Sequence, residues 1–311
     1  AFLVHDDQAL KTSHASLSLF SDWIDIIGSI GFSGFGEISL RSTGDMTLTD
    51  QSYNSLGREI AWRGQLRTPG NLTVGASRIY PTTLSDFTLQ SDHGRITVLP
   101  GGTVPGTPIN SAGGSLTVAA AEIHHQGYMA APMGRLRFLG LSGSAADRIQ
   151  LGPSSVTSIA CNTNVRYGEL DNIYWTTYEK PKILTPKREI QKVPVEALPT
   201  RSLYIAGEKV IAQEGSAIDI SGGGAIFGYE YSPGINGLVN PLEVEGRHVV
   251  LPGQIQPGEA VYLTGGAYLP SGTYALLEEE YAFLPGAYVV EDLGPLQEVI
   301  TTGTSDQGYF I

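Results

Sequence analysis

Gly94-Arg-Ile-Thr-Val98 and Gly114-Ser-Leu-Thr-Val118 share a five-residue pattern of glycine, polar, apolar, Ser/Thr/Arg and apolar residues. Four further windows repeat it: Gly36-Glu-Ile-Ser-Leu40, Gly44-Asp-Met-Thr-Leu48, Gly70-Asn-Leu-Thr-Val74 and Gly134-Arg-Leu-Arg-Phe138. In an extended strand, alternation places the two apolar residues of a window on one face and the polar residues on the other. So short a strand cannot bury its apolar face alone, which predicts that the copies stack on one another.

The spacing of the windows indicates how they stack. From Gly44 onward they start 26, 24, 20 and 20 residues apart, whereas Gly36 and Gly44 are 8 apart. We interpret the longer intervals as one coil and the short one as a spacing within a coil. The leading glycine suits a sharp corner where the backbones approach closely. The pattern therefore predicts an all-β fold, a right-handed parallel β-helix or solenoid with about 4.8 Å between coils.

Other repeat folds agree less well with this spacing. A propeller blade needs about 40 residues, and a leucine-rich repeat needs a ladder of Leu and Asn that the chain lacks. Secondary strands are predicted between the windows, at 78–80, 87–89 and 122–124, as expected when each coil carries two or three short strands.

Composition divides the chain into three parts. Residues 1–160 carry the coil pattern, and 161–202 form an extended excursion rich in proline, lysine and aromatic residues. In 203–311 the coils resume and end in β-hairpins, whose predicted strands are 260–263, 272–277 and 287–290. We expect one continuous rod with no independent second domain.

Charge and residue counts exclude several classes of protein. The 311 residues include 19 Lys and Arg against 31 Asp and Glu, a net charge of −12 that disfavours nucleic-acid binding. The 39 glycines and 18 prolines argue against a helix bundle. No apolar run reaches the roughly 20 residues that a membrane span needs. The lone Cys161 cannot form a disulfide within the chain or a thiolate metal cluster.

The sequence contains a few candidate catalytic and metal-binding residues. Asp86 and Asp92, the latter followed by His93, resemble a hydrolase arrangement only superficially, and His124 and His125 should point to opposite faces of a strand. The second position of the repeat reads Glu37, Asp45, Asn71, Arg95, Ser115 and Arg135, which we interpret as a mixed, solvated face. We therefore predict no catalytic residue, no cofactor and no bound metal.

One stretch of the excursion is a candidate for binding. It contains Tyr174, Trp175 and Tyr178 beside Lys180 and Lys182. Aromatic faces can stack on sugars or anchor a partner protein. Alternatively, these rings fold back and cover the flank of the rod.

Several longer motifs carry a family resemblance. They are Ala61-Trp62-x-Gly64-x-Leu66-x-x-Pro69-Gly70-x-Leu72-Thr73-Val74, Arg78-Ile79-Tyr80-Pro81, Ala112-Gly113-Gly114-Ser115-Leu116-Thr117-Val118, Ile218-Asp219-Ile220-Ser221-Gly222-Gly223-Gly224 and Tyr281-Ala282-x-Leu284-Pro285-Gly286-Ala287-Tyr288. These motifs resemble the secreted exoproteins of the filamentous haemagglutinin type, which leave the cell by two-partner secretion. The resemblance implies an internal or C-terminal fragment of a secreted or cell-surface adhesin, on the outer side of a Gram-negative outer membrane.

The resemblance and the repeat together predict a non-catalytic rod segment that acts in cell adhesion, aggregation or filament formation. The expected partners are a surface glycan or protein, the outer-membrane transporter during export, and a second copy of the chain joined end to end. Two alternatives stay open. One is a carbohydrate-active β-helix enzyme, a polysaccharide lyase or hydrolase, and the other is the stalk of a contact-dependent toxin-delivery protein.

Overall fold

The computed structural model describes residues 10–55, 59–171, 174–179, 191–229, 247–250, 260–263, 269–276, 288–292 and 309–310. Within these residues the protein is all-β, and its helical content is one 3-10 turn, η1 (Leu141–Gly143). The chain forms two compact units: Ala1–Tyr167 with Thr177–Ile226, and Gly168–Thr176 with Phe227–Ile311. The predicted all-β class is confirmed.

Three parallel sheets make up most of the first unit. Sheet A contains, in spatial order, β1 (Ser16–Ser21), β4 (Glu37–Ser42), β8 (Asn71–Ala76), β11 (Arg95–Pro100), β13 (Glu122–His125), β16 (Ala146–Leu151) and β22 (Gly207–Ala212). Sheet B contains β2 (Ile24–Ile27), β5 (Met46–Thr49), β9 (Ile79–Pro81), β14 (Tyr128–Ala130), β17 (Val156–Ser158) and β23 (Ala217–Asp219). Sheet C contains β3 (Ser29–Gly31), β7 (Glu59–Thr68), β10 (Asp86–Ser91), β12 (Ser115–Ala119), β15 (Arg135–Leu139) and β21 (Ser202–Ile205), and β6 (Gln51–Ser55) pairs antiparallel with β7.

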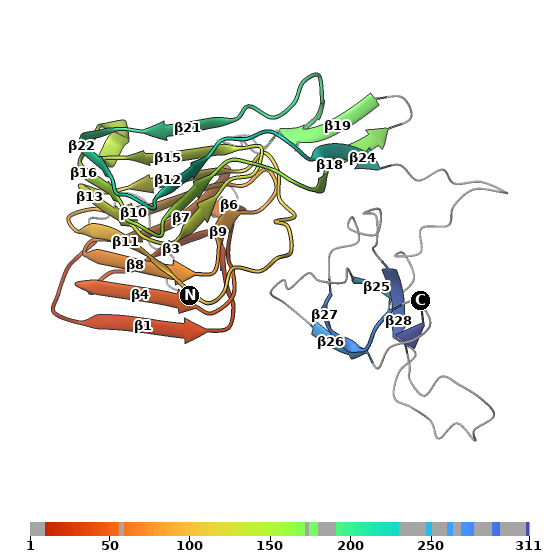
Figure 1. The fold of residues 1–311 in the computed structure, drawn as a ribbon, viewed down its shortest axis with the longest axis horizontal. Helices are drawn as coiled ribbons and strands as arrows, with labels where there is room; N and C mark the ends of the chain where they lie inside the picture. The colour runs from red at the N-terminus through yellow and green to blue at the C-terminus, as the bar shows by residue number, and fades with distance from the viewer. Residues whose placement is uncertain are drawn as a thin grey trace. The chain divides into compact units, whose positions relative to one another are not determined.

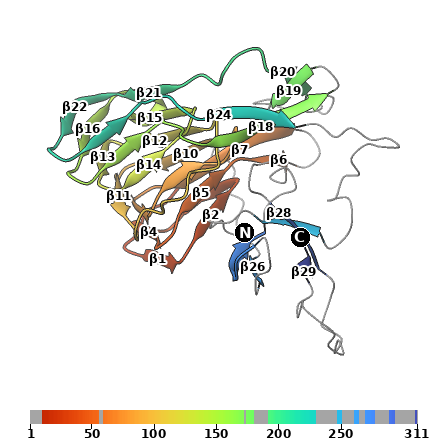
Figure 2. The same ribbon diagram turned by 45° about the vertical axis from the view of Figure 1, so that its right-hand side comes forward.

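The chain visits these sheets in rotation. It passes from β1 in sheet A to β2 in sheet B and β3 in sheet C, and then returns to sheet A at β4. Neighbouring strands of a sheet are therefore one circuit apart, and Figure 1 shows those of sheet A one above another from β1 to β22. The turned view in Figure 2 shows the strands of all three sheets in the same stack.

Alternating side chains join the three sheets around one apolar core. Leu72 and Val74 of β8 lie in register with Ile96 and Val98 of β11, and all four are fully buried. Leu116 of β12 and Leu136 of β15 repeat this arrangement in sheet C. Each circuit adds apolar side chains to one continuous cluster, so burial of apolar area stabilises the stack along its whole length.

All six predicted windows form strands, but the interpretation of their spacing is wrong in part. The windows became β4, β8 and β11 of sheet A, β5 of sheet B, and β12 and β15 of sheet C. The intervals from Gly70 to Gly94 and from Gly114 to Gly134 each span one circuit. The 26 residues from Gly44 to Gly70 and the 20 residues from Gly94 to Gly114 instead connect windows of different sheets. Windows of different sheets look alike because a strand of any of the three sheets follows a corner and needs the same alternation of apolar and polar residues.

The second repeat positions are likewise divided among the sheets, which corrects their interpretation as one solvated face. In sheet A, Glu37, Asn71 and Arg95 lie in adjacent strands, and Arg95 pairs with Glu122 at 3.7 Å. Asp45, by contrast, is only 1% exposed at the corner before β5.

The remaining described strands form smaller sheets. β20 (Gln191–Pro194), β19 (Tyr174–Glu179), β18 (Asn164–Asp171) and β24 (Ala225–Tyr229) form a four-stranded sheet in that order. In the second unit β26 (Ala260–Leu263) pairs antiparallel with β27 (Gly272–Ala275), and β28 (Tyr288–Asp292) pairs antiparallel with both β25 (Arg247–Val250) and β29 (Tyr309–Phe310). Strands thus occur within each of the three predicted hairpin segments.

Candidate functional site

One circuit of the stack lacks its strand in sheet B. After β11 the chain reaches β12 of sheet C through residues 101–114, which form no strand. As a result β9 and β14 pair directly through Ile79 and Met129, although the circuit of β11 and β12 lies between their own circuits. We call residues 101–114 the bypass loop.

Polar groups hold the bypass loop against the stack. The hydroxyl oxygen of Ser77 lies 2.6 Å from the carbonyl oxygen of Thr43 and 3.1 Å from that of Thr103. Farther along the loop, the Ser111 hydroxyl donates to the carbonyl oxygen of Pro81 at 2.6 Å. Side chains at both ends of the loop thus fix its course.

A buried ion pair supports the middle of the loop. The Arg78 Nε lies 3.0 Å from both carboxylate oxygens of Asp45, and the Arg78 Nη1 donates to the carbonyl oxygen of Thr107. The Tyr80 hydroxyl donates to Asp45 at 3.3 Å. A paired and hydrogen-bonded charge tolerates burial, whereas an unpaired one does not. The pair therefore links the loop to the corner before β5.

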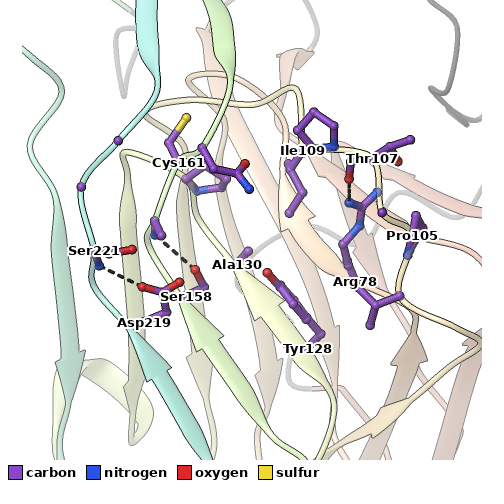
Figure 3. A pocket seen from close by; sticks show the side chains of 18 residues that line it. Arg78, Pro105, Thr107, Ile109, Tyr128, Ala130, Ser158, Cys161, Asp219 and Ser221 are labelled. Carbon is purple, nitrogen blue, oxygen red and sulfur yellow. Dashed lines mark hydrogen bonds between the residues drawn. The ribbon is translucent and has the colours of Figure 1, made fainter.

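The bypass loop forms one wall of a pocket of about 530 Å³ in the first unit. Its lining comes from the bypass loop, from β14, β17 and β23 with the segments that follow them, and from Arg78 just before β9. Figure 3 shows Arg78 and Ile109 on one side, Ser158, Asp219 and Cys161 on the other, and Tyr128 between them.

The floor of the pocket follows from the register of sheet B. Ala130, Ser158 and Asp219 occupy equivalent positions of β14, β17 and β23, so their side chains share one face of the sheet. Ser158 is buried. Its Oγ accepts a hydrogen bond from the Ala160 N–H at 3.2 Å, and its hydroxyl is also hydrogen-bonded to that of Tyr128. Asp219 is exposed and accepts from the Ser221 N–H at 2.9 Å.

Local interactions set the protonation states of two lining groups. The hydroxyl and the backbone N–H of Ser221 hold the pKa of Asp219 below its usual range. Burial raises the pKa of Tyr128, although the positive charge of Arg78 opposes this shift. At neutral pH the pocket therefore presents a carboxylate and a protonated phenol.

The binding residues predicted from the sequence lie elsewhere. Trp175 of β19 is half-buried and pairs in register with Leu170 of β18. Tyr174 and Tyr178 also belong to β19. The other two predicted contact residues, Lys180 and Lys182, lie outside the described residues.

Other motif residues have structural partners. Asp92 forms an ion pair with Arg67, whose Nε lies 2.9 Å from the carboxylate. The prediction that His124 and His125 face opposite ways is confirmed, since His125 is fully buried and the His124 side chain is partly exposed. Within the described residues, no group of three or more His, Cys, Asp or Glu side chains is arranged to hold a metal ion.

The pocket could not be predicted from the sequence, because its residues are far apart in the chain. Arg78, Tyr128, Ser158 and Asp219 come from different circuits and become neighbours only when the sheets form. A usable signal was present, however. The interval 99–113 is rich in proline and glycine and contains no alternating window.

No protein-family model, no curated protein and no solved structure matches the chain. In the part of the chain that the structure describes, no helix has the length and apolar character of a membrane span.

Proposed function

We propose that this chain is a non-catalytic structural segment of a secreted or cell-surface exoprotein of the filamentous haemagglutinin type. In this proposal sheets A, B and C are the three faces of a right-handed parallel β-helix that acts in adhesion, aggregation or filament formation. The observation that carries the proposal is the rotation of the chain through three parallel sheets around one apolar core.

Such an arrangement suits a mechanical role. Each strand of the stack is hydrogen-bonded to the circuits before and after it, and its inward side chains pack on theirs. Bending or stretching the stack would have to break both kinds of contact at once. The protein therefore holds surface groups at fixed positions along a stiff support.

The two ends of the stack support assembly with another copy. Leu19 of β1 is in register with the buried Leu40, yet it is 50% exposed. At the opposite end, Val210 of β22 faces inward beside Ile149 and is 47% exposed. Among the described residues these edges have no paired strand, and exposed inward side chains beside such an edge favour addition of a further strand.

The lengths of the end strands fit a head-to-tail contact between copies. β1 and β22, the two edges of sheet A, contain six residues each. The edges of sheets B and C are three or four residues long at both ends of the stack. A second copy could therefore continue all three sheets in parallel register, and the product would be a filament.

The same proposal covers location and partners. A segment of this kind would lie outside a Gram-negative outer membrane after passing a two-partner transporter, and its sides would contact a glycan or protein of another surface. The stalk of a contact-dependent toxin-delivery protein would use the same architecture, with activity in a separate domain.

Sedimentation velocity and negative-stain electron microscopy of the whole chain test the assembly. We expect the wild-type protein to form end-to-end oligomers as its concentration rises. Leu19→Lys should abolish them, because the new charge would lie in the apolar contact between copies. Phe20→Lys is the matched control, since Phe20 is the next residue of β1 and lies in register with the outward Arg41.

Two results would contradict the proposal. One is a wild-type protein that stays monomeric and shows no elongated particles at any concentration. The other is release of reducing ends or unsaturated sugars from acidic or neutral polysaccharides, because turnover would favour the carbohydrate-active enzyme instead.

A further inference from the structure

We propose that the pocket between the bypass loop and sheet B binds a neutral pyranose sugar, with Asp219 as the principal acceptor of its hydroxyl protons. The inference deepens the proposed adhesive function and rests on it for the source of the sugar, a glycan of another surface. Its principal residue, Asp219, lies at the end of β23 in sheet B, whereas the end-to-end contact is tested at Leu19 of β1 in sheet A.

The pocket is held open by contacts that exist without a ligand. Its floor consists of paired strands of sheet B, and the bypass loop is fixed by Arg78 through the Thr107 carbonyl. Ile109 of the loop packs against Tyr80 and Ala130 of sheet B. A binding site formed in advance loses less conformational freedom when its ligand enters.

The charges of the lining favour an uncharged ligand. Among the described lining residues, Arg78 is the cation and Asp219 the anion, one of each sign. Asp45 already neutralises Arg78 from behind the pocket wall. A carboxylate ligand would therefore find little free positive charge, and it would be repelled by Asp219.

The hydrogen-bonding groups match the hydroxyls of a sugar. Asp219 accepts hydrogen bonds from both the N–H and the hydroxyl of Ser221, and a carboxylate has acceptor capacity for further donors. The Ser158 and Tyr128 hydroxyls are hydrogen-bonded to each other, so one of their two protons remains for a ligand, and the Asn162 side chain adds both an amide donor and a carbonyl acceptor. Sugar hydroxyls both donate and accept, so they satisfy such a mixed set better than a simple ion does.

The remaining lining is apolar and of suitable size. Tyr128, Ile109, Pro105 and Pro132 provide carbon surface on which the C–H face of a pyranose can pack. The volume of about 530 Å³ lies within the roughly 300–1,000 Å³ typical of small-ligand sites. The pocket thus has room for one ring, with space for its attachment to a longer glycan.

Ligand-observed NMR on the whole chain tests the proposal. The probes are D-glucose, D-galactose, D-mannose and N-acetyl-D-glucosamine, each measured by saturation transfer and then by titration. At least one should bind, and Asp219→Asn should weaken that binding about tenfold, because a charge-assisted hydrogen bond is lost. Asp147→Asn is the matched control, since it makes the same change at an exposed position of β16 in sheet A, and it should bind as the wild type does.

Three outcomes would overturn the inference. They are no binding of any neutral probe up to its solubility, equal binding by the wild type and Asp219→Asn, and binding confined to charged D-glucosamine or D-glucuronate. Sedimentation of the same variants separates this result from the proposed function. Failure of sugar binding with intact end-to-end assembly refutes the pocket alone, whereas loss of assembly in the wild type refutes the proposed function.

Discussion

His125 places a titratable ring inside the apolar core. Its Nε2 lies 3.1 Å from the carbonyl oxygen of Val156, and its ring stacks on Phe138 with centroids 5.6 Å apart. Burial lowers the pKa of His125 from 6.5 to about 4. The folded protein therefore contains the neutral imidazole at neutral pH, with its proton on Nε2 where Val156 can accept it.

This buried ring makes stability depend on pH. Between pH 6.5 and about 4 the unfolded chain binds a proton at His125 that the folded chain does not, so the free energy of unfolding falls as the pH falls through this range. The full effect is about 3 kcal/mol. Urea denaturation at several pH values should show this slope in the wild type and a shallower one in His125→Gln. His124→Gln, which changes the outward neighbour, should keep most of the slope, and equal slopes in the wild type and His125→Gln would contradict this explanation.

Removing one member of the Asp45–Arg78 pair should lower the free energy of unfolding more than removing both. Asp45→Leu leaves the Arg78 charge buried without its carboxylate, which costs about 3–5 kcal/mol of stability. The double variant Asp45→Leu/Arg78→Met removes both charges and should recover much of that loss. Urea denaturation of the two single variants and the double variant measures the coupling, and strictly additive losses would refute it.

At the scale of the element, the corners determine how closely successive circuits stack. A Cβ atom at Gly134 would overlap the carbonyl oxygen of Gly114, the corresponding corner one circuit earlier. Gly94 and Gly70 have the same relation before sheet A. These glycines are needed for close backbone approach between coils and not for an unusual φ.

Gly134→Ala should therefore destabilise the protein by about 1–3 kcal/mol or more, because the backbone must move to admit the methyl group. Gly106→Ala is the matched control, because Gly106 has nothing within 4 Å of its Cβ position and its stability should change by less than about 0.5 kcal/mol. Thermal unfolding followed by circular dichroism compares the two. Similar melting temperatures for both variants would show that the corners do not set the spacing.

Strand positions were predictable because their signal is local. In Gly114-Ser-Leu-Thr-Val118 the alternation alone identifies Leu116 and Val118 as core residues, and both are fully buried. The sheet to which a window belongs is not a local property, since sheets A, B and C impose the same pattern. The missing strand of the bypass loop and the pocket beside it depend on contacts between distant circuits, which no single window encodes.

At the scale of the whole molecule, the net charge of −12 acts against self-association. Two copies brought end to end repel each other at low ionic strength, and salt screens that repulsion while the apolar contact remains. Raising sodium chloride from low salt to about 0.5 M should therefore increase the mean oligomer size in sedimentation velocity. Leu19→Lys should stay monomeric throughout, and dissociation of wild-type oligomers by salt would mean that ion pairs hold them together instead.

The bypass loop is a segment whose sequence can vary while the sheets around it stay the same. The paired strands on either side of it keep their register although one circuit has no strand in sheet B. Insertions and substitutions in residues 104–109 would therefore alter the shape of the pocket wall without changing the framework beneath it. Randomising these positions on an otherwise constant chain would make a library of surfaces for selecting new specificities, as recognition loops do on an antibody framework.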